Sequence, residues 1–95
     1  MIARRFLIAG RVQGVGYRVF AETAAARRGV AGWVRNRDDG TVEVLAEGTP
    51  EAVEALKRDL LAGPRHADVA EIQETIEAPA GTFEGFHVIY GEELG

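Results

Sequence analysis

The stretch with the clearest chemical potential is Gly10-Arg11-Val12-Gln13-Gly14-Val15-Gly16-Tyr17-Arg18. An apolar run precedes it and a helical pattern follows it, so its glycines stand where a strand gives way to a helix. Backbone N–H groups at the start of a helix have no partner within the helix and carry its partial positive charge. Arg18 adds a planar guanidinium whose paired donors match two oxygens of a phosphoryl group. This stretch predicts an anion site, and a phosphoryl group suits it best.

A second polar residue, Asn36, stands between Arg35 and Arg37 in an otherwise strand-like stretch. Asparagine is uncommon inside strands, and at a strand end it usually bonds to nearby backbone. Beside a phosphoryl group, its amide could instead accept from and donate to a water molecule and hold that water for attack. Which interpretation holds depends on whether Asn36 lies near the glycine loop.

Apolar and alternating stretches predict strands over residues 6–9, 32–37, 41–47, 69–77 and 86–90. The hairpin turn between the second and third strands is expected at Asp38-Asp39-Gly40. Helices are expected over residues 18–28, before Gly29, and from Thr49-Pro50-Glu51 to Gly63-Pro64. This order, βαββαβ with a short additional strand, is typical of the α+β class and of a ferredoxin-like sandwich. In such a sandwich two helices cover one face of a mainly antiparallel sheet of four or five strands.

The expected topology links the two polar motifs. A strand, a crossover helix and a second strand usually form a right-handed parallel pair. The strands over residues 6–9 and 32–37 should then end at the same edge of the sheet. That arrangement would bring Asn36 close to the glycine loop.

Length and composition limit the class of protein. The chain of 95 residues suits a single domain, 1–95, and lacks cysteine, which excludes disulfides and thiolate chemistry. No apolar run approaches the roughly 20 residues that span a bilayer, and residues 1–5 lack the apolar stretch of a signal peptide. We therefore expect a cytoplasmic protein without membrane association. We also expect a monomer, because no second large apolar stripe is left over.

The charge is unevenly distributed along the chain. Residues 1–37 contain eight arginines and one acid, whereas the remainder contains three basic residues and fourteen acids. With a net charge of −4, this asymmetry suits a small anion bound at one place. An extended nucleic-acid surface would favour a more basic chain overall.

The glycines of the loop also have a purely structural explanation. Glycine at positions 10, 14 and 16 could simply permit a tight turn between strand and helix. The loop lacks the third glycine of a dinucleotide fingerprint, since position 19 is valine, and no Gly-Lys-Ser/Thr follows for a P-loop. Taken alone, the loop leaves both explanations open.

Other candidate residues have ordinary structural explanations. His66 and His87 are far apart in sequence and lack metal-ligand spacing, so we expect structural or surface roles for both. Asp38 and Asp39 precede Gly40 and are expected to form the turn. A solvated surface is expected for the acids Glu71, Glu74, Glu77, Glu92 and Glu93.

The two motifs together resemble the acylphosphatase family. The resemblance is carried by Gly10 to Arg18 and by Gly32-Trp33-Val34-Arg35-Asn36-Arg37-Asp38-Asp39-Gly40-Thr41-Val42. It extends to the chain length, the order of elements and the final strand over residues 86–90. It implies hydrolysis of a carboxylic-phosphoric anhydride to carboxylate and phosphate, without metal or cofactor. The implied partner is a small acyl phosphate, with inorganic phosphate as product and competitive inhibitor.

The resemblance also implies roles for particular residues. Arg18 matches the catalytic arginine of the family, and Asn36 matches the asparagine that orients the nucleophilic water. Gly14, Val15, Gly16 and Tyr17 match the backbone cradle that binds the phosphoryl group together with Arg18. For this family, one suggested mechanism lets the substrate phosphate itself accept the proton of the water.

Two features depart from the family pattern. Gly16 stands where many relatives carry an aromatic residue, which is expected to loosen the cradle and to affect affinity more than reaction type. Residues 91–95 extend past the usual end at the last strand.

A binding module without catalysis is the alternative from another functional class, with RNA or a small regulatory anion as ligand. Sheet-surface RNA binding needs exposed aromatics on adjacent central strands and an Arg/Lys-Gly-Phe/Tyr signature, which this sequence lacks. Trp33 and Tyr17 could stack a base, but we expect core packing for Trp33 and cradle support for Tyr17. Hydrolysis explains Arg18 and Asn36 together, whereas binding explains only the arginines.

Overall fold

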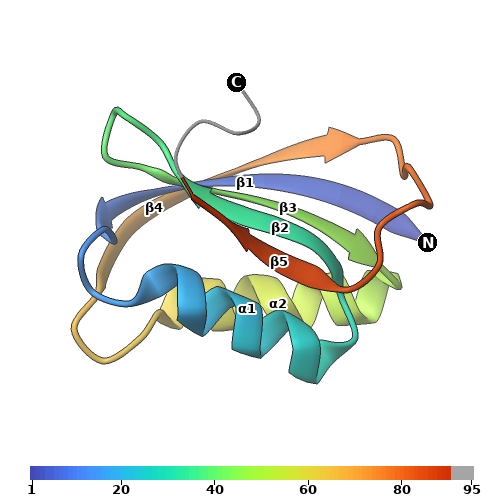
Figure 1. The fold of residues 1–95 in the computed structure, drawn as a ribbon, viewed down its shortest axis with the longest axis horizontal. Coiled ribbons are helices and arrows are strands. Elements are labelled where there is room, and N and C mark those ends of the chain that lie inside the picture. Colours follow the sequence, from blue (N-terminus) through green and yellow to red (C-terminus); the bar gives the residue numbers. More distant parts are fainter. Residues whose placement is uncertain (91–95) are drawn as a thin grey trace.

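The computed structural model describes residues 1–90, so the expectation about the 91–95 extension lies outside the described residues, as do Glu92 and Glu93. Its elements are β1 (Ile2–Arg11), α1 (Tyr17–Arg28), β2 (Ala31–Asn36), β3 (Val42–Gly48), α2 (Pro50–Ala62), β4 (Asp68–Glu77) and β5 (Phe86–Ile89). The two helices lie side by side on one face of a single twisted sheet (Figure 1). Within residues 1–90, no helix is long and apolar enough to cross a membrane.

The sheet has the strand order β4-β1-β3-β2-β5. All neighbours are antiparallel except β2 and β5, which are parallel. The predicted α+β class and ferredoxin-like βαββαβ arrangement are confirmed. The short strand is β5, with 4 residues, whereas β4 is a full strand of 10 residues at the opposite edge.

The prediction for the first two strands is wrong in one respect and right in another. β1 and β2 are not a hydrogen-bonded pair, because β3 lies between them. Each is antiparallel to β3, so β1 and β2 still run in the same direction. Ile8 of β1 and Asn36 of β2 face the same residue of β3, Val42, from its two sides. The ends of β1 and β2 therefore meet at one edge of the sheet, as expected.

The helix boundaries follow the predicted signals. α1 ends at Gly29, whose left-handed backbone lets its N–H reach the carbonyls of Ala25 and Ala26. The hydroxyl of Thr49 accepts from the N–H of Ala52 at 3.1 Å and caps α2, with Pro50 as its first residue. At the other end of α2, Gly63 donates to the carbonyl of Asp59.

The hydrophobic core lies between the helices and the sheet. Small residues of α1 allow this helix to pack closely, and α2 supplies larger ones. The core residues of the helices include Ala21, Ala24, Ala25, Val53, Leu56 and Leu60, and those of the sheet include Phe6, Ile8, Val34, Val42 and Val44. This packing holds the start of α1 against the edge where β1 and β2 end.

The opposite face of the sheet carries charged side chains, and there the prediction for Trp33 is wrong. Successive strand residues point to opposite faces, and Val34 occupies the helix-facing position. Trp33 is half-buried on the other face, with the guanidinium of Arg35 5.8 Å from its ring. Beside it, the buried carboxylate of Glu43 binds both Arg5 and Arg35. Trp33 therefore packs against an ion-pair network instead of the core.

Candidate functional site

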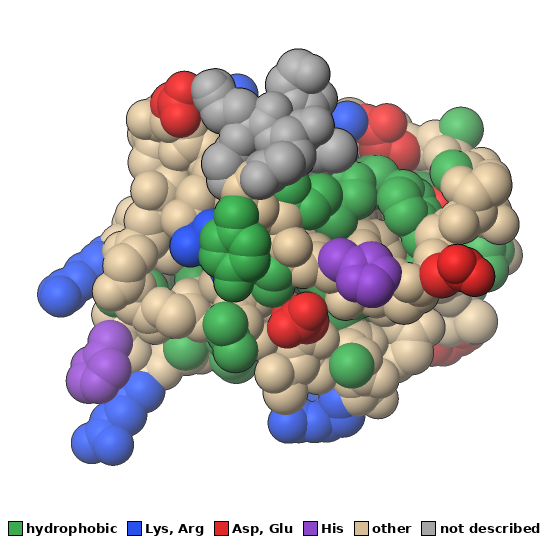
Figure 2. Space-filling view, in the orientation of Figure 1, with side chains coloured by type: hydrophobic (Ala, Val, Ile, Leu, Met, Phe, Trp, Pro, Cys, Tyr) green, Lys and Arg blue, Asp and Glu red, His purple; other side chains and the backbone are tan. Residues whose placement is uncertain are grey.

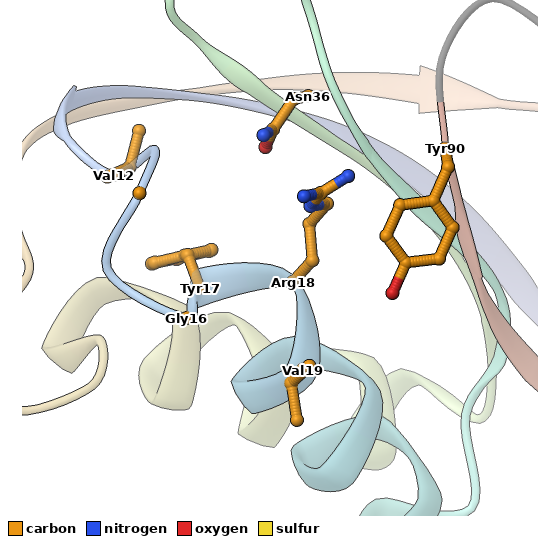
Figure 3. A pocket seen from close by; sticks show the side chains of 8 residues that line it. Val12, Gly16, Tyr17, Arg18, Val19, Asn36 and Tyr90 are labelled. Atoms are coloured by element: carbon orange, nitrogen blue, oxygen red, sulfur yellow. The ribbon is translucent and has the colours of Figure 1, made fainter.

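A pocket of about 100 Å³ opens at the edge where β1, β2 and β5 end and α1 begins. The close-up in Figure 3 shows the residues that line it: Val12, Gly14, Gly16, Tyr17, Arg18, Val19, Asn36 and Tyr90. They come from three distant parts of the chain: the loop with the first turn of α1, the end of β2, and the residue after β5. The tertiary fold therefore assembles this pocket.

The loop between β1 and α1 needs glycine at two positions. Gly14 and Gly16 have φ values of 74° and 77°, a left-handed conformation that other residues adopt only at a cost. Gly16 is the residue before α1, and its carbonyl accepts the first helical hydrogen bond, from the N–H of Phe20 at 3.1 Å. The N–H groups of the first helical turn consequently have no acceptor within the helix. They lie beside the pocket, where an anion can accept from them.

Gly16 also bears on the predicted departure from the family pattern. A Cβ atom added at Gly16 would meet no heavy atom within 4 Å. A Cβ atom at this position is therefore opposed by the left-handed backbone conformation and not by a clash with neighbouring atoms.

Arg18 is the second residue of α1 and the cation of the pocket. In Figure 3 its guanidinium lies in the middle of the site, with the amide of Asn36 on one side and the ring of Tyr90 on the other. The guanidinium carbon is 4.6 Å from the centre of that ring. This position puts the positive charge of Arg18 next to the helix start, so both attract the same anion.

Asn36 is the last residue of β2, and its amide points toward Arg18 (Figure 3). Its side-chain oxygen is buried and accepts no hydrogen bond from the described protein atoms. An unpaired buried acceptor costs about 1–3 kcal/mol, so such atoms are rare outside functional sites. The oxygen of Asn36 is thus suited to accept from a ligand or from a water in the pocket.

Two hydrogen-bonding side chains hold the loop in place. The amide of Gln13 donates to the carbonyls of Arg37 and Thr41, at 2.8 and 2.9 Å, and so joins the loop to the base of the β2–β3 hairpin. The hydroxyl of Tyr17 donates to the carbonyl of Leu60 at 2.6 Å and joins the start of α1 to α2. Burial raises the pKa of Tyr17, so this hydroxyl keeps its proton and acts as a fixed donor.

The structure brings most of the predicted site residues together. Gly14, Gly16, Tyr17, Arg18 and Asn36 all line the pocket, whereas Val15 does not, and its side chain packs against the core. Sequence reasoning missed Gln13 as an anchor, together with the lining residues Val12, Val19 and Tyr90. Tyr90 reaches the edge of the sheet that carries the pocket because β5 pairs in parallel with β2, and no local sequence pattern predicts that pairing.

The two histidines and Asp39 behave as predicted. The two histidines, His66 and His87, are exposed (purple in Figure 2) and lie outside the pocket. The carboxylate of Asp39 accepts from the backbone and the hydroxyl of Thr41, so it stabilises the hairpin turn. Within residues 1–90, no group of three or more His, Cys, Asp or Glu side chains could hold a metal ion.

The open face of the sheet offers little support for RNA binding. Of its three interior strands, β1 and β3 present Arg5, Leu7, Glu43 and Leu45 there, and none of these is aromatic. Trp33 on β2 is half-buried and already contacts Arg35. Stacking platforms for RNA use aromatic side chains on adjacent central strands, which this face does not provide.

Comparisons with known proteins agree with this geometry. The family model described as acylphosphatase matches residues 4–88. An acylphosphatase of Acidiphilium cryptum is 52% identical over 79 residues, which cover 83% of this chain and 87% of the relative. The crystal structure of acylphosphatase from Bacillus subtilis superposes with a TM-score of 0.91 at 39% identity, covering 95% of this chain and 100% of that one. An acylphosphatase structure from Coxiella burnetii gives 0.88 at 27% identity, over 93% and 92% of the two chains. The predicted resemblance is confirmed, and this chain belongs to the acylphosphatase family.

Proposed function

We propose that this protein hydrolyses the carboxyl-phosphate bond of small acyl phosphates, giving a carboxylate and inorganic phosphate. Family membership supports the reaction type. The pocket supports the assignment of roles to residues: Arg18 and the backbone of Gly14, Val15, Gly16 and Tyr17 bind the phosphoryl group, and Asn36 orients the attacking water.

One observation carries this assignment. A cation, a helix start and an unpaired buried amide oxygen converge on a pocket of about 100 Å³, although they come from separate elements. A site that only bound an anion would need the first two of these features. The buried oxygen of Asn36 accepts hydrogen bonds and repels anionic oxygens, so it suits a water better than it suits the phosphoryl group itself.

The reaction follows from these positions. A water that donates one O–H to the Asn36 oxygen keeps a lone pair free to attack phosphorus. The new bond joins the water oxygen to phosphorus, and the bond from phosphorus to the carboxylate oxygen breaks. The carboxylate leaves with the electron pair, and the water proton passes to a phosphoryl oxygen. Arg18 and the helix start stabilise the charge on the equatorial oxygens during this transfer.

The lining residues supply no carboxylate and no imidazole. An acyl phosphate already has a good leaving group, so catalysis can depend on positioning and charge stabilisation without a strong protein base. The proposal therefore includes no metal ion and no cofactor, and inorganic phosphate is expected to compete with substrate for the Arg18 site.

The proposal also includes two further predictions from the sequence. We expect a monomer, which sedimentation would report as a species of about the chain mass of 10.2 kDa. A cytoplasmic location remains a prediction.

The decisive experiment measures hydrolysis of benzoyl phosphate through the loss of its ultraviolet absorbance, with a chelator present throughout. We expect turnover well above the spontaneous rate, competitive inhibition by inorganic phosphate, and loss of both turnover and phosphate affinity in Arg18→Ala. Arg58→Ala, on an exposed position of α2, is the matched control and should behave as wild type.

Two results would contradict the proposal. Folded protein without turnover would leave an anion-binding module, and RNA and metabolite binding would then be measured. Loss of activity on chelation, with recovery on adding zinc or magnesium, would contradict the metal-free mechanism.

A further inference from the structure

Arg18 differs from most basic side chains within residues 1–90 in the kind of group that lies next to its charge. Carboxylates lie within salt-bridge distance of Arg4, Arg5, Arg28, Arg35, Arg37 and Lys57. Arg18 has no such partner within residues 1–90, and its guanidinium carbon lies 4.6 Å from the ring centre of Tyr90. In the described structure, an aromatic ring takes the place of the usual acidic neighbour.

This difference matters for an anion site. A carboxylate beside Arg18 would offset its charge and occupy its N–H donors, so a phosphoryl group would have to displace it. A ring attracts the cation through its quadrupole without adding negative charge to the site. The donors that a phosphoryl group needs therefore stay available while the flexible side chain is restrained.

The position of Tyr90 suits this role. β5 pairs in parallel with β2, and Ile89 lies opposite Arg35, so the next residues along both strands, Tyr90 and Asn36, come to the same edge. The Tyr90 ring lines the pocket and is 58% exposed. A side chain this exposed contributes little to the hydrophobic core, so a structural explanation for its position is weak.

We propose that Tyr90 is a positioning residue, whose ring holds the guanidinium of Arg18 in the orientation that receives the phosphoryl group. The catalytic consequence rests on the proposed function, whereas the effect on phosphate binding does not. Restraint before binding lowers the entropy lost on binding, because the arginine side chain otherwise samples many rotamers.

The test is a titration with inorganic phosphate, followed by NMR through the amide signals of Gly14 and Gly16. We expect Tyr90→Leu and Tyr90→Ala to weaken phosphate binding about 2- to 5-fold, which corresponds to a cation–π contact at an exposed site. Tyr90→Phe keeps the ring and should bind as wild type. Leu61→Ala is the matched control, because Leu61 is also an exposed hydrophobic residue, at 49%, but lies on α2.

Two further measurements separate positioning from a merely structural effect. The titration is extended to phosphate concentrations that measure the residual affinity of Arg18→Ala, and in that background Tyr90→Leu should cause no additional loss, since its effect passes through Arg18. The side-chain proton signals of Arg18 should carry a ring-current shift in wild type and Tyr90→Phe, and this shift should disappear in Tyr90→Leu.

The outcomes distinguish this inference from the proposed function. Wild-type phosphate affinity in Tyr90→Leu, or an equal loss in the presence and absence of Arg18, would overturn the role of Tyr90 and leave hydrolysis untouched. The opposite result is phosphate binding that depends on Tyr90 in a protein that fails to turn over benzoyl phosphate. That result would support the role of Tyr90 while refuting the proposed reaction.

Discussion

Arg18 and Asn36 bring two different kinds of polar group to one pocket. The guanidinium of Arg18 supplies charge and several donors, whereas the amide of Asn36 is neutral and its buried oxygen can only accept. A neutral acceptor next to a cation can hold a water while the cation remains available to the phosphoryl group. The division of roles therefore predicts that the two residues can be separated by mutation.

At the residue scale, Asn36→Ala should lower kcat about 100-fold, because a water that is no longer positioned attacks poorly. The affinity for inorganic phosphate should change less than about 2-fold, since Arg18 and the loop are intact. Steady-state kinetics and the inhibition constant for phosphate give both values. Normal turnover in Asn36→Ala would remove the water-positioning role even if the protein proved to be a hydrolase.

At the element scale, the site depends on contacts between segments that are distant in sequence. Gln13 binds the loop to the hairpin base, through carbonyls of residues adjacent to both hairpin strands. Those carbonyls also accept from the N–H groups of Gly40 and Arg37, so the turn keeps its own hydrogen bonds without Gln13. Loss of Gln13 should therefore loosen the loop and leave the hairpin formed.

We accordingly expect Gln13→Ala to cost about 1–3 kcal/mol of unfolding free energy for two lost hydrogen bonds, and to weaken phosphate binding. Urea denaturation and a phosphate titration measure the two effects. Gln73→Ala is the control, because Gln73 is exposed on β4 and, within residues 1–90, its side chain bonds to nearby Glu71. Unchanged phosphate affinity in a measurably destabilised Gln13→Ala would show that this contact serves the fold and not the site.

The two helices are joined by a paired contact between Arg28 of α1 and Asp59 of α2, at 2.9 and 3.0 Å. The hydrogen bonds from Arg28 lower the pKa of Asp59 below its ordinary value of 3.8. Because the pKa of Asp59 is lower in the folded protein than in the unfolded chain, its carboxylate stabilises the fold at pH values above the unfolded-state pKa. This stabilisation is lost as the pH falls through the folded-state pKa.

Asp59→Asn should therefore lower the unfolding free energy by about 0.2–1 kcal/mol at pH 7, the range measured for exposed ion pairs. The difference from wild type should shrink steadily as the pH falls below 3.8. Urea denaturation of both proteins from pH 2 to 7 measures it. A difference that stays constant across this range would mean that the carboxylate charge contributes nothing.

At the scale of the whole molecule, the pocket and the fold should be thermodynamically linked. The hydrophobic core sets the start of α1 against the edge of the sheet, so the pocket exists only in the folded protein. A ligand that binds only the folded state stabilises it in proportion to the logarithm of its concentration. Inorganic phosphate should then raise the unfolding free energy by about 2.7 kcal/mol at 100 times its Kd.

Thermal or urea denaturation over a series of phosphate concentrations tests this linkage, with sulfate-free buffer at constant ionic strength. The stabilisation should be lost in Arg18→Ala and retained in Arg58→Ala. Equal stabilisation of both variants would indicate a general salt effect unrelated to the pocket.

Much of this protein could be predicted from its sequence, because local chemistry determines many of its features. The Thr49 cap, the Gly29 helix end and the Asp39 turn each depend on residues within a few positions, and all were correct. The turn from β1 to α1, with its glycines and Arg18, is likewise determined locally, since one short stretch contains all of it. The length and alternation of the apolar runs were enough to predict the elements and the fold class.

Only the tertiary structure decided how those elements meet. It placed β3 between β1 and β2, and it turned Trp33 away from the core toward Arg35. It also brought Tyr90 to Arg18. Such contacts depend on the order of strands in the sheet and on the packing of segments far apart in the chain, which the periodic pattern of a single segment does not determine. The sequence alone was sufficient to identify the glycine loop and Arg18 as candidates, whereas the complete pocket required the fold.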